Sequence, residues 1–150
     1  MPHSFSNLLI HAVFSTKDRA RCLDDSLRSN LFPYIGGILR SVRAEPRLVN
    51  GTEDHVHILV GLPTDLSVAD CLRAVKANSS RWIHEMSPPH RGFAWQDGYG
   101  AFTVSASNEE AVFEYIRRQE QHHRHVSFQE EFVALLRKHR VAFDERFIWR

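Results

Sequence analysis

The sequence predicts an α+β fold of the ferredoxin-like (split βαβ) type: a four-stranded antiparallel sheet with helices on one face, extended by C-terminal helices. One observation is the order of apolar periodicities, which runs strand, helix, strand, strand, helix, strand, helix, helix. Another is Asn50-Gly51, a strong β-hairpin signal between the second and third strands. A chain of 150 residues that is 43% hydrophobic has the size of one domain with one core. We therefore expect residues 1–150 to form a single domain.

The first half of the chain reads as a strand, a helix and a hairpin. Its first segment, NLLIHAVFST, is rich in large apolar and β-branched residues, which is typical of a central strand. The next segment repeats apolar residues at helical spacing after Asp24 or Asp25, either of which can cap a helix, although Pro33 argues against one straight helix. The expected ranges are 7–16 for the strand, 24–42 for the helix, and 44–53 and 54–62 for the hairpin.

The second half reads as a helix, a strand and two more helices. Ser67 can cap the first of these helices. Asn108 opens the second, and Glu109 and Glu110 favour its N-terminus because acidic side chains interact well with that end of the helix dipole. The strand contains a turn or bulge at DGYG. The expected ranges are 67–86, 93–105, 108–123 and 127–139, followed by a strand-like tail at 140–150.

Composition limits the functional classes without choosing among them. The formal net charge is only +1, so the whole chain is not a strongly basic nucleic-acid binder. Three of the 19 basic residues are lysines and the rest are arginines, which suit phosphate contacts and surface ion pairs equally. Cys22 and Cys71 are far apart, as in a reduced cytoplasmic protein, and no stretch approaches the length of a membrane span. We expect a cytoplasmic protein with no membrane partner.

Two histidines in EDHVHILVGLP raise the first functional question. Side chains alternate between the faces of a strand, so His55 and His57 share one face while Val56 and Ile58 share the other. Two imidazoles at this spacing can converge on one divalent ion. The alternative interpretation is that His55 and His57 are simply half-exposed polar residues on the outer face of an antiparallel sheet. Glu53 and Asp54, just before the pair, can orient an imidazole through a hydrogen bond or serve only hairpin solubility.

A second pair of residues lies on the predicted helix at 108–123. Tyr115 and Gln119 are four residues apart, so a phenol and a carboxamide occupy one helical face. The amide oxygen can bind a cation and the phenol oxygen can act as a nucleophile. The alternative is that both residues form the edge of a packed apolar face. The QHHRH segment at 121–125 resembles a metal-binding tract, but we interpret it as a solvated helix end.

Together, HVH at 55–57 and YIRRQ at 115–119 resemble the motifs of the single-tyrosine HUH transposases of the smallest bacterial insertion sequences and their repeat-associated relatives. Further resemblance runs through VNGTEDHVHILVGLP, LRAVKANSSRWIHE and FAWQDGYGAFTVS and covers essentially the whole chain. The resemblance implies a ferredoxin-like fold that carries the two motifs on a strand and a downstream helix. It also implies homodimers, in which the tyrosine helix of many members completes the partner's active site.

The resemblance assigns roles to four residues. His55, His57 and Gln119 would bind a divalent ion, Mg²⁺ or Mn²⁺, and Tyr115 would attack DNA to form a 5′-phosphotyrosine. The group that takes the tyrosine proton is not evident from the sequence, and neither is whether Tyr115 acts within its own subunit. The implied substrate is single-stranded DNA beside a short hairpin.

Basic and aromatic residues are candidates for contact with that DNA. Arginine and lysine bind backbone phosphates, and Trp82 or Trp95 could stack on a base. For each of them a solvated-surface or core position is a competing explanation. The basic candidates are Arg19, Arg21, Arg73, Lys76, Arg81, Arg117, Arg118 and Arg124.

Two other functions compete with a strand-transferring enzyme. A non-catalytic nucleic-acid-binding or regulatory protein descended from such a transposase fits the near-zero net charge. A metal-dependent phosphohydrolase could use the two histidines with water, but it would leave Tyr115 without a role.

Overall fold

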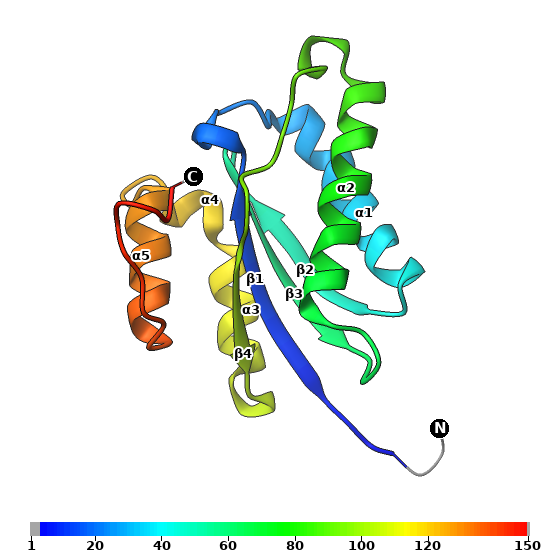
Figure 1. Ribbon diagram of the computed structural model, residues 1–150, viewed down its shortest axis with the longest axis vertical. Coiled ribbons are helices and arrows are strands. Elements are labelled where there is room, and N and C mark those ends of the chain that lie inside the picture. Colours follow the sequence, from blue (N-terminus) through cyan, green and yellow to red (C-terminus); the bar gives the residue numbers. More distant parts are fainter. Residues whose placement is uncertain (1–3, 150) are drawn as a thin grey trace.

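Residues 4–149 are described by a computed structural model, which contains one four-stranded sheet (Figure 1). All neighbouring strands are antiparallel, and their order is β2-β3-β1-β4, so the expected ferredoxin-like fold is confirmed. None of the helices in this range is long and apolar enough to cross a bilayer. The strands are β1 (Leu8–Ser15), β2 (Glu45–Gly51), β3 (His55–Leu62) and β4 (Gly100–Val104); the helices are α1 (Asp25–Ser41), α2 (Val68–Met86), α3 (Glu109–Arg117), α4 (Gln119–His122) and α5 (Phe128–Lys138); and 3₁₀ turns lie at Lys17–Arg19, Pro88–His90 and Ala106–Asn108.

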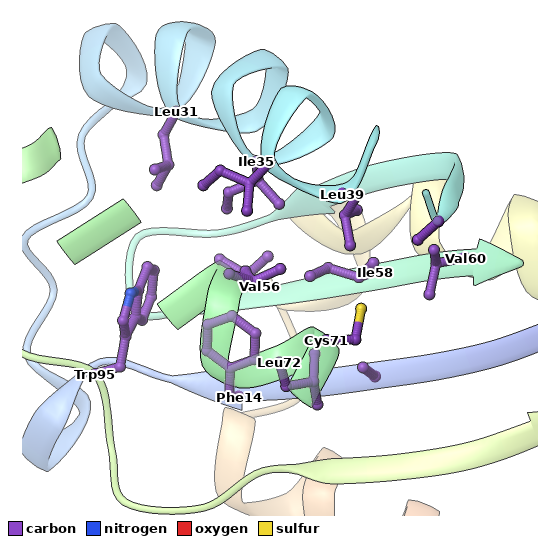
Figure 2. Packing of buried hydrophobic residues seen from close by; sticks show 14 of the residues in the cluster. Phe14, Leu31, Ile35, Leu39, Val56, Ile58, Val60, Cys71, Leu72 and Trp95 are labelled. Carbon is purple, nitrogen blue, oxygen red and sulfur yellow. The ribbon is translucent and has the colours of Figure 1, made fainter. Parts of the chain in front are cut away.

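Helices cover both faces of the sheet. Helices α1 and α2 lie on one face, and α3 and α5 lie on the other (Figure 1). The larger core fills the first face, where Val56, Ile58 and Val60 of β3 pack with Phe14 and the helices (Figure 2). The C-terminal helices therefore do more than extend the fold, because they bury the face of the sheet that carries the two histidines.

Two of the expected helix caps are confirmed, whereas the side chain of Asn108, which precedes α3, makes no capping hydrogen bond. The Asp24 side chain accepts a hydrogen bond from the Leu27 backbone N–H, and the Ser67 side chain accepts one from Asp70. Helix α1 continues without a break through Pro33. Pro33, nine residues after the cap, disrupts the helix less than expected because the buried apolar face of α1 holds the helix together.

The hairpin differs from the prediction in where it turns. Asn50 and Gly51 are not the turn; they belong to β2, where they pair with His57 and Val56. The turn lies at residues 52–54, and the Thr52 N–H donates to the His55 carbonyl at 3.0 Å. A Cβ atom on Gly51 would stand 2.1 Å from that same carbonyl oxygen, so glycine is needed here for the close approach of two backbones.

This close approach gives a stability prediction. Gly51→Ala should lower the free energy of unfolding by about 2 kcal/mol, because the new methyl group meets backbone that cannot move aside without opening the hairpin. Gly37→Ala is the matched control, since nothing lies within 4 Å of its Cβ and alanine is the better helix former. Urea unfolding monitored by circular dichroism measures both. Equal stability of the two variants would contradict the close contact.

The predicted helix at 108–123 is two helices, because the chain bends at Arg118 (φ −96°, ψ 20°). The Asn50 side chain of β2 donates to the carbonyl oxygens of Ile116 and Arg117, at 2.9 and 3.2 Å. An unbroken helix would use those carbonyls for the next turn. The bend starts α4 at Gln119, whose side chain is fully buried.

The C-terminal tail is not a strand, contrary to the prediction. Among its described residues, Phe143, Ile148 and Trp149 pack against the apolar cluster of α5, which includes Phe128 and Phe132. The tail therefore packs against its own chain through these side chains, which stay partly exposed.

Candidate metal and nucleophile site

The two histidines of β3 lie at the centre of a buried polar cluster. Both side chains are fully buried, so the half-exposed alternative is wrong. The His57 Nε2 atom is 3.0 Å from Oε1 of Glu131 in α5, and the His55 Nε2 atom is 3.4 Å from the same oxygen. The shared strand face, closed over by α3 to α5, directs both imidazoles to one point.

Tyr115 and Gln119 meet the histidines at this point. The His55 Nε2 and Gln119 Oε1 atoms are 3.0 Å apart, and the Gln119 amide donates to Glu131 Oε2 at 2.9 Å. The Tyr115 hydroxyl donates to the same Oε2 atom. All four residues that the sequence singled out therefore surround the carboxylate of Glu131.

Glu131 and His123 are the members of the cluster that the sequence reasoning missed. The His123 Nε2 atom is 3.0 Å from Glu131 Oε1, and the side chain is 10% exposed, so our interpretation of 121–125 as a solvated helix end is wrong for this residue. One signal was available for Glu131, which lies three residues after Phe128 and four before Leu135, on the apolar face of α5. A carboxylate in that position needs a buried partner.

These side chains form a group that can hold a metal ion. One ligand atom from each of His55, His57, His123 and Glu131 lies within 4.8 Å of every other, and the Gln119 oxygen is adjacent. Imidazole nitrogens and carboxylate or amide oxygens are donors that divalent metals use in proteins. The donor set therefore fits a divalent cation.

Neighbouring residues orient the two imidazoles. The His55 Nδ1 atom is 2.7 Å from an Asp54 carboxylate oxygen and 3.0 Å from the Thr52 hydroxyl. Of the two acids considered, Asp54 therefore makes the hydrogen bond to an imidazole, and Glu53 pairs with Arg21 instead. The His57 Nδ1 atom shares a 2.7 Å hydrogen bond with His11 of β1, another residue that the sequence reasoning missed. Both imidazoles thus have Nδ1 engaged and direct Nε2 into the cluster.

Burial and mutual charge shift the pKa values of these groups strongly. Burial acts to raise the pKa of Glu131, but the charge of His57 and hydrogen bonds from His123 and His55 outweigh it and hold that pKa far below its usual range. Burial, followed by the charge and hydrogen bond of Glu131, raises the pKa of the Tyr115 hydroxyl well above that of a free phenol. Burial lowers the pKa of His11 to about 3. Tyr115 is therefore protonated at neutral pH and faces an ionised carboxylate.

The orienting contact gives a prediction for Asp54. Asp54→Asn should weaken Mn²⁺ binding about tenfold, because an amide holds the His55 ring with less charge than a carboxylate does. Glu53→Gln is the matched control. Glu53 is the adjacent acidic residue, its side chain is half-exposed, and it forms an ion pair with Arg21 at 3.8 Å. Isothermal titration calorimetry with Mn²⁺ measures both. An unchanged affinity in Asp54→Asn would show that the ring needs no such support.

A cleft of about 560 Å³ between α3 and α5 leads to the tyrosine. Its lining is mostly apolar and includes Val112, Leu135 and Tyr115. Lys138 and His139 add positive or polar groups to the same cleft. The cleft gives the face of Tyr115 an opening to the outside of the protein.

The predicted DNA-contacting residues are scattered and mostly paired. Lys76 donates to the backbone carbonyls of Gln96 and Gly98, at 2.7 and 2.6 Å, so its ammonium group holds the loop before β4. Trp95 is buried and donates to Ser79, so it is not available to stack on a base. Arg19 stacks on Trp149, and the remaining pairs are Arg21 with Glu53, Arg73 with Asp70, Arg81 with Asn78, and Arg117 and Arg118 with Glu114.

Solved structures similar to this chain include two transposases. One is a candidate transposase from Deinococcus radiodurans R1, with a TM-score of 0.64 and 26% identity, covering 78% of this chain and 94% of that one. The other is a REP-associated tyrosine transposase bound to a REP hairpin, with a TM-score of 0.62 and 14% identity, covering 81% of this chain and 71% of that one. At 14% identity, the second structure shows that the two chains share a fold.

The sequence itself matches a family model. A search of curated proteins finds no match. The model of IS200-like transposases, however, matches residues 4–119, which include the HVH and YIRRQ segments. That range is more than half of the chain and spans the whole sheet and the start of α4. The chain therefore belongs to the family of IS200-like transposases.

Proposed function

We propose that this protein cleaves and rejoins single-stranded DNA through a covalent bond to Tyr115, assisted by a divalent metal ion. The observation that carries the proposal is the meeting of the Tyr115 hydroxyl with His55, His57 and Gln119 around one buried carboxylate. These residues come from β3, α3 and α4, and neither an ordinary apolar core nor a simple metal site requires a phenol among them.

His55, His57 and Gln119 are the proposed metal ligands, and His123 and Glu131 extend the donor set. Mn²⁺ accepts imidazole nitrogen more readily than Mg²⁺, which prefers oxygen, so we propose Mn²⁺ as the better fit of the two predicted ions. A bound divalent ion would act as a Lewis acid that reduces the negative charge of the phosphodiester.

Tyr115 performs the bond-forming step of the proposed reaction. Its oxygen attacks phosphorus, the bond from phosphorus to the 3′ oxygen breaks, and a 3′-hydroxyl leaves while the 5′ phosphate stays on the tyrosine. The ester keeps the energy of the original bond, so another DNA 3′-hydroxyl can reverse the step without ATP. The cleft between α3 and α5 is the proposed path of the strand to this oxygen.

Single-stranded DNA with a short hairpin is the proposed substrate. Support comes from the similar fold that is bound to a REP hairpin, and from the exposed Arg117 and Arg118 at the C-terminal end of the tyrosine helix. The Tyr115 hydroxyl reaches Glu131 of its own chain, which favours action within one subunit. The expected homodimer would then not be needed to supply the nucleophile, and it stays a prediction, as does the cytoplasmic location.

A direct experiment tests the proposed reaction. The protein is incubated with Mn²⁺ and 5′- or 3′-labelled single-stranded hairpins taken from the DNA on both sides of its gene, and then run on a denaturing gel. A protein–DNA adduct that retains the label 3′ of the cut is expected. Hairpin binding without cleavage would favour the non-catalytic regulator, and cleavage without an adduct would favour the phosphohydrolase.

A further inference from the structure

The cleft between α3 and α5 extends well beyond the tyrosine. The two helices run in opposite directions (Figure 1), so Tyr115 near the end of α3 lies beside Glu131 near the start of α5. From there the same cleft continues along α5, past Leu135 to Lys138. Lys138 is seven residues after Glu131, a distance of about 10 Å at the helical rise of 1.5 Å per residue. The cleft therefore has room for more of a DNA strand than the phosphate that Tyr115 attacks.

The middle of the cleft is apolar. Its walls carry Ala111 and Val112 from α3, and Ala134 and Leu135 from α5. None of these side chains donates or accepts a hydrogen bond, so this part suits a flat apolar face better than a charged group. Every nucleobase has such a face. The cleft volume of about 560 Å³ lies within the range of about 300 to 1,000 Å³ that is usual for small-molecule sites, so one base with its sugar fits there.

The far end of the cleft carries an exposed cation. Lys138 forms no ion pair with any of the described residues, whereas the neighbouring Arg137 pairs with Glu145 at 3.7 Å. The exposed acidic residue of the cleft wall, Glu130, is more than two helical turns from Lys138 and accepts a hydrogen bond from the Ser127 backbone N–H. An exposed ammonium group without an acidic partner is suited to a DNA phosphate.

The position of the cleft beside the phenol indicates which nucleotide it takes. In an in-line displacement the attacking and leaving oxygens lie on opposite sides of phosphorus. The leaving 3′ oxygen, and the nucleotide that carries it, therefore point away from the tyrosine oxygen. The nucleotide that stays bonded to the tyrosine through its 5′ phosphate is free to lie alongside the phenol ring, and Tyr115 is itself part of the cleft wall.

We infer that the cleft between α3 and α5 binds the first nucleotide on the 3′ side of the cut, with its base between Val112 and Leu135 and the phosphate that follows it on Lys138. The inference rests on the proposed function, for which it names a subsite and a positioning residue. An unpaired base enters such a cleft without the cost of leaving a duplex, so the subsite also favours a single strand over a duplex at the cut.

The main test combines Lys138→Gln with a strand that lacks one charge. Once the cut has been mapped, a methylphosphonate replaces the phosphate that follows the first nucleotide 3′ of it. At low DNA concentration, the parent protein should form the adduct about tenfold more slowly on this strand than on the unmodified one. Lys138→Gln should lose about tenfold on the unmodified strand and no more on the methylphosphonate strand, because both changes remove the same contact. At saturating DNA the rates should converge, because Lys138 acts on binding and not on the bonds that change.

Arg137→Gln is the matched control. It removes the same charge from the adjacent position, but Arg137 pairs with Glu145 and is not part of the cleft wall. This variant should keep the parent rate on the unmodified strand and the full tenfold difference between the two strands. A methylphosphonate one nucleotide on the 5′ side of the cut is the control for the strand, and it should leave Lys138→Gln and the parent equally affected.

Ala134→Leu tests the place of the base. Leucine at this exposed helical position keeps the propensity for α5 but fills the apolar middle of the cleft. The matching strand carries an abasic residue as the first nucleotide 3′ of the cut. The parent should need about tenfold more of the abasic strand than of the intact strand for half-maximal adduct formation, as for the loss of one stacked base. Ala134→Leu should need equally raised concentrations of both strands.

The outcomes separate this inference from the proposed function. If the parent forms the adduct but the methylphosphonate slows Lys138→Gln as much as the parent, Lys138 does not bind that phosphate, and the inference fails while the proposed function stands. The same conclusion follows if the parent does not distinguish the abasic strand from the intact one. If the parent forms no adduct with any of the hairpins, the proposed function fails and the subsite fails with it.

Discussion

Tyr115→Phe is expected to fold like the parent protein and to form no covalent complex with DNA. The substitution removes one oxygen from a ring that packs at the edge of a buried cluster, so the apolar contacts survive. The oxygen is the proposed attacking atom, and removal of a nucleophile costs about 10⁴-fold or more in rate. Adduct formation on a hairpin substrate, measured on a denaturing gel, checks this expectation.

Tyr99→Phe is the matched control for this prediction. Tyr99 lies just before β4, is 37% exposed, and lines a different cleft, together with Lys76 and Trp95. It should form the adduct at the parent rate. An adduct that persists in Tyr115→Phe and disappears in Tyr99→Phe would move the nucleophile to the other phenol, and an adduct that persists in both would require a nucleophile of another type.

His57→Ala is expected to lose both stability and metal response. The imidazole is fully buried and bonded to His11 and Glu131, so its removal leaves a cavity, takes the hydrogen-bond partner from His11 and removes one of several from Glu131, at a cost of about 3 kcal/mol. At about 100 times its dissociation constant, Mn²⁺ should stabilise the parent by about 2.7 kcal/mol and the variant much less. Chemical unfolding with and without Mn²⁺ measures both effects.

Leu59→Ala separates these two losses. Leu59 lies on the same strand and the same face as His57 and is equally buried, but it offers no ligand atom. It should be destabilised to a similar degree and keep the full response to Mn²⁺. If Mn²⁺ stabilises His57→Ala as much as the parent, this imidazole is not a ligand. If Mn²⁺ no longer stabilises Leu59→Ala, the loss of stabilisation comes from the lower stability of the protein and not from a missing ligand.

The sequence predicted most of the fold because the strands and helices carry clear local patterns. Alternation along β3 placed His55 and His57 on one face, and the spacing of four residues within the predicted helix at 108–123 related Tyr115 to Gln119. The prediction erred where a distant side chain intervened. Asn50 binds the carbonyls at the end of α3 and interrupts the helix, and no pattern within residues 108–123 indicates this.

The sequence by itself determined the ferredoxin-like order of elements, the pairing of the two imidazoles on one face and the four motif residues. Periodicity and spacing are local properties and suffice for the first two conclusions, whereas the roles of the four motif residues follow from their resemblance to a known family. The tertiary structure alone decided that α4 and α5 close over that face and bring His123 and Glu131 to the histidines. Glu131 is 74 residues from His57 along the chain, and a contact over that separation depends on how the helices pack against the sheet.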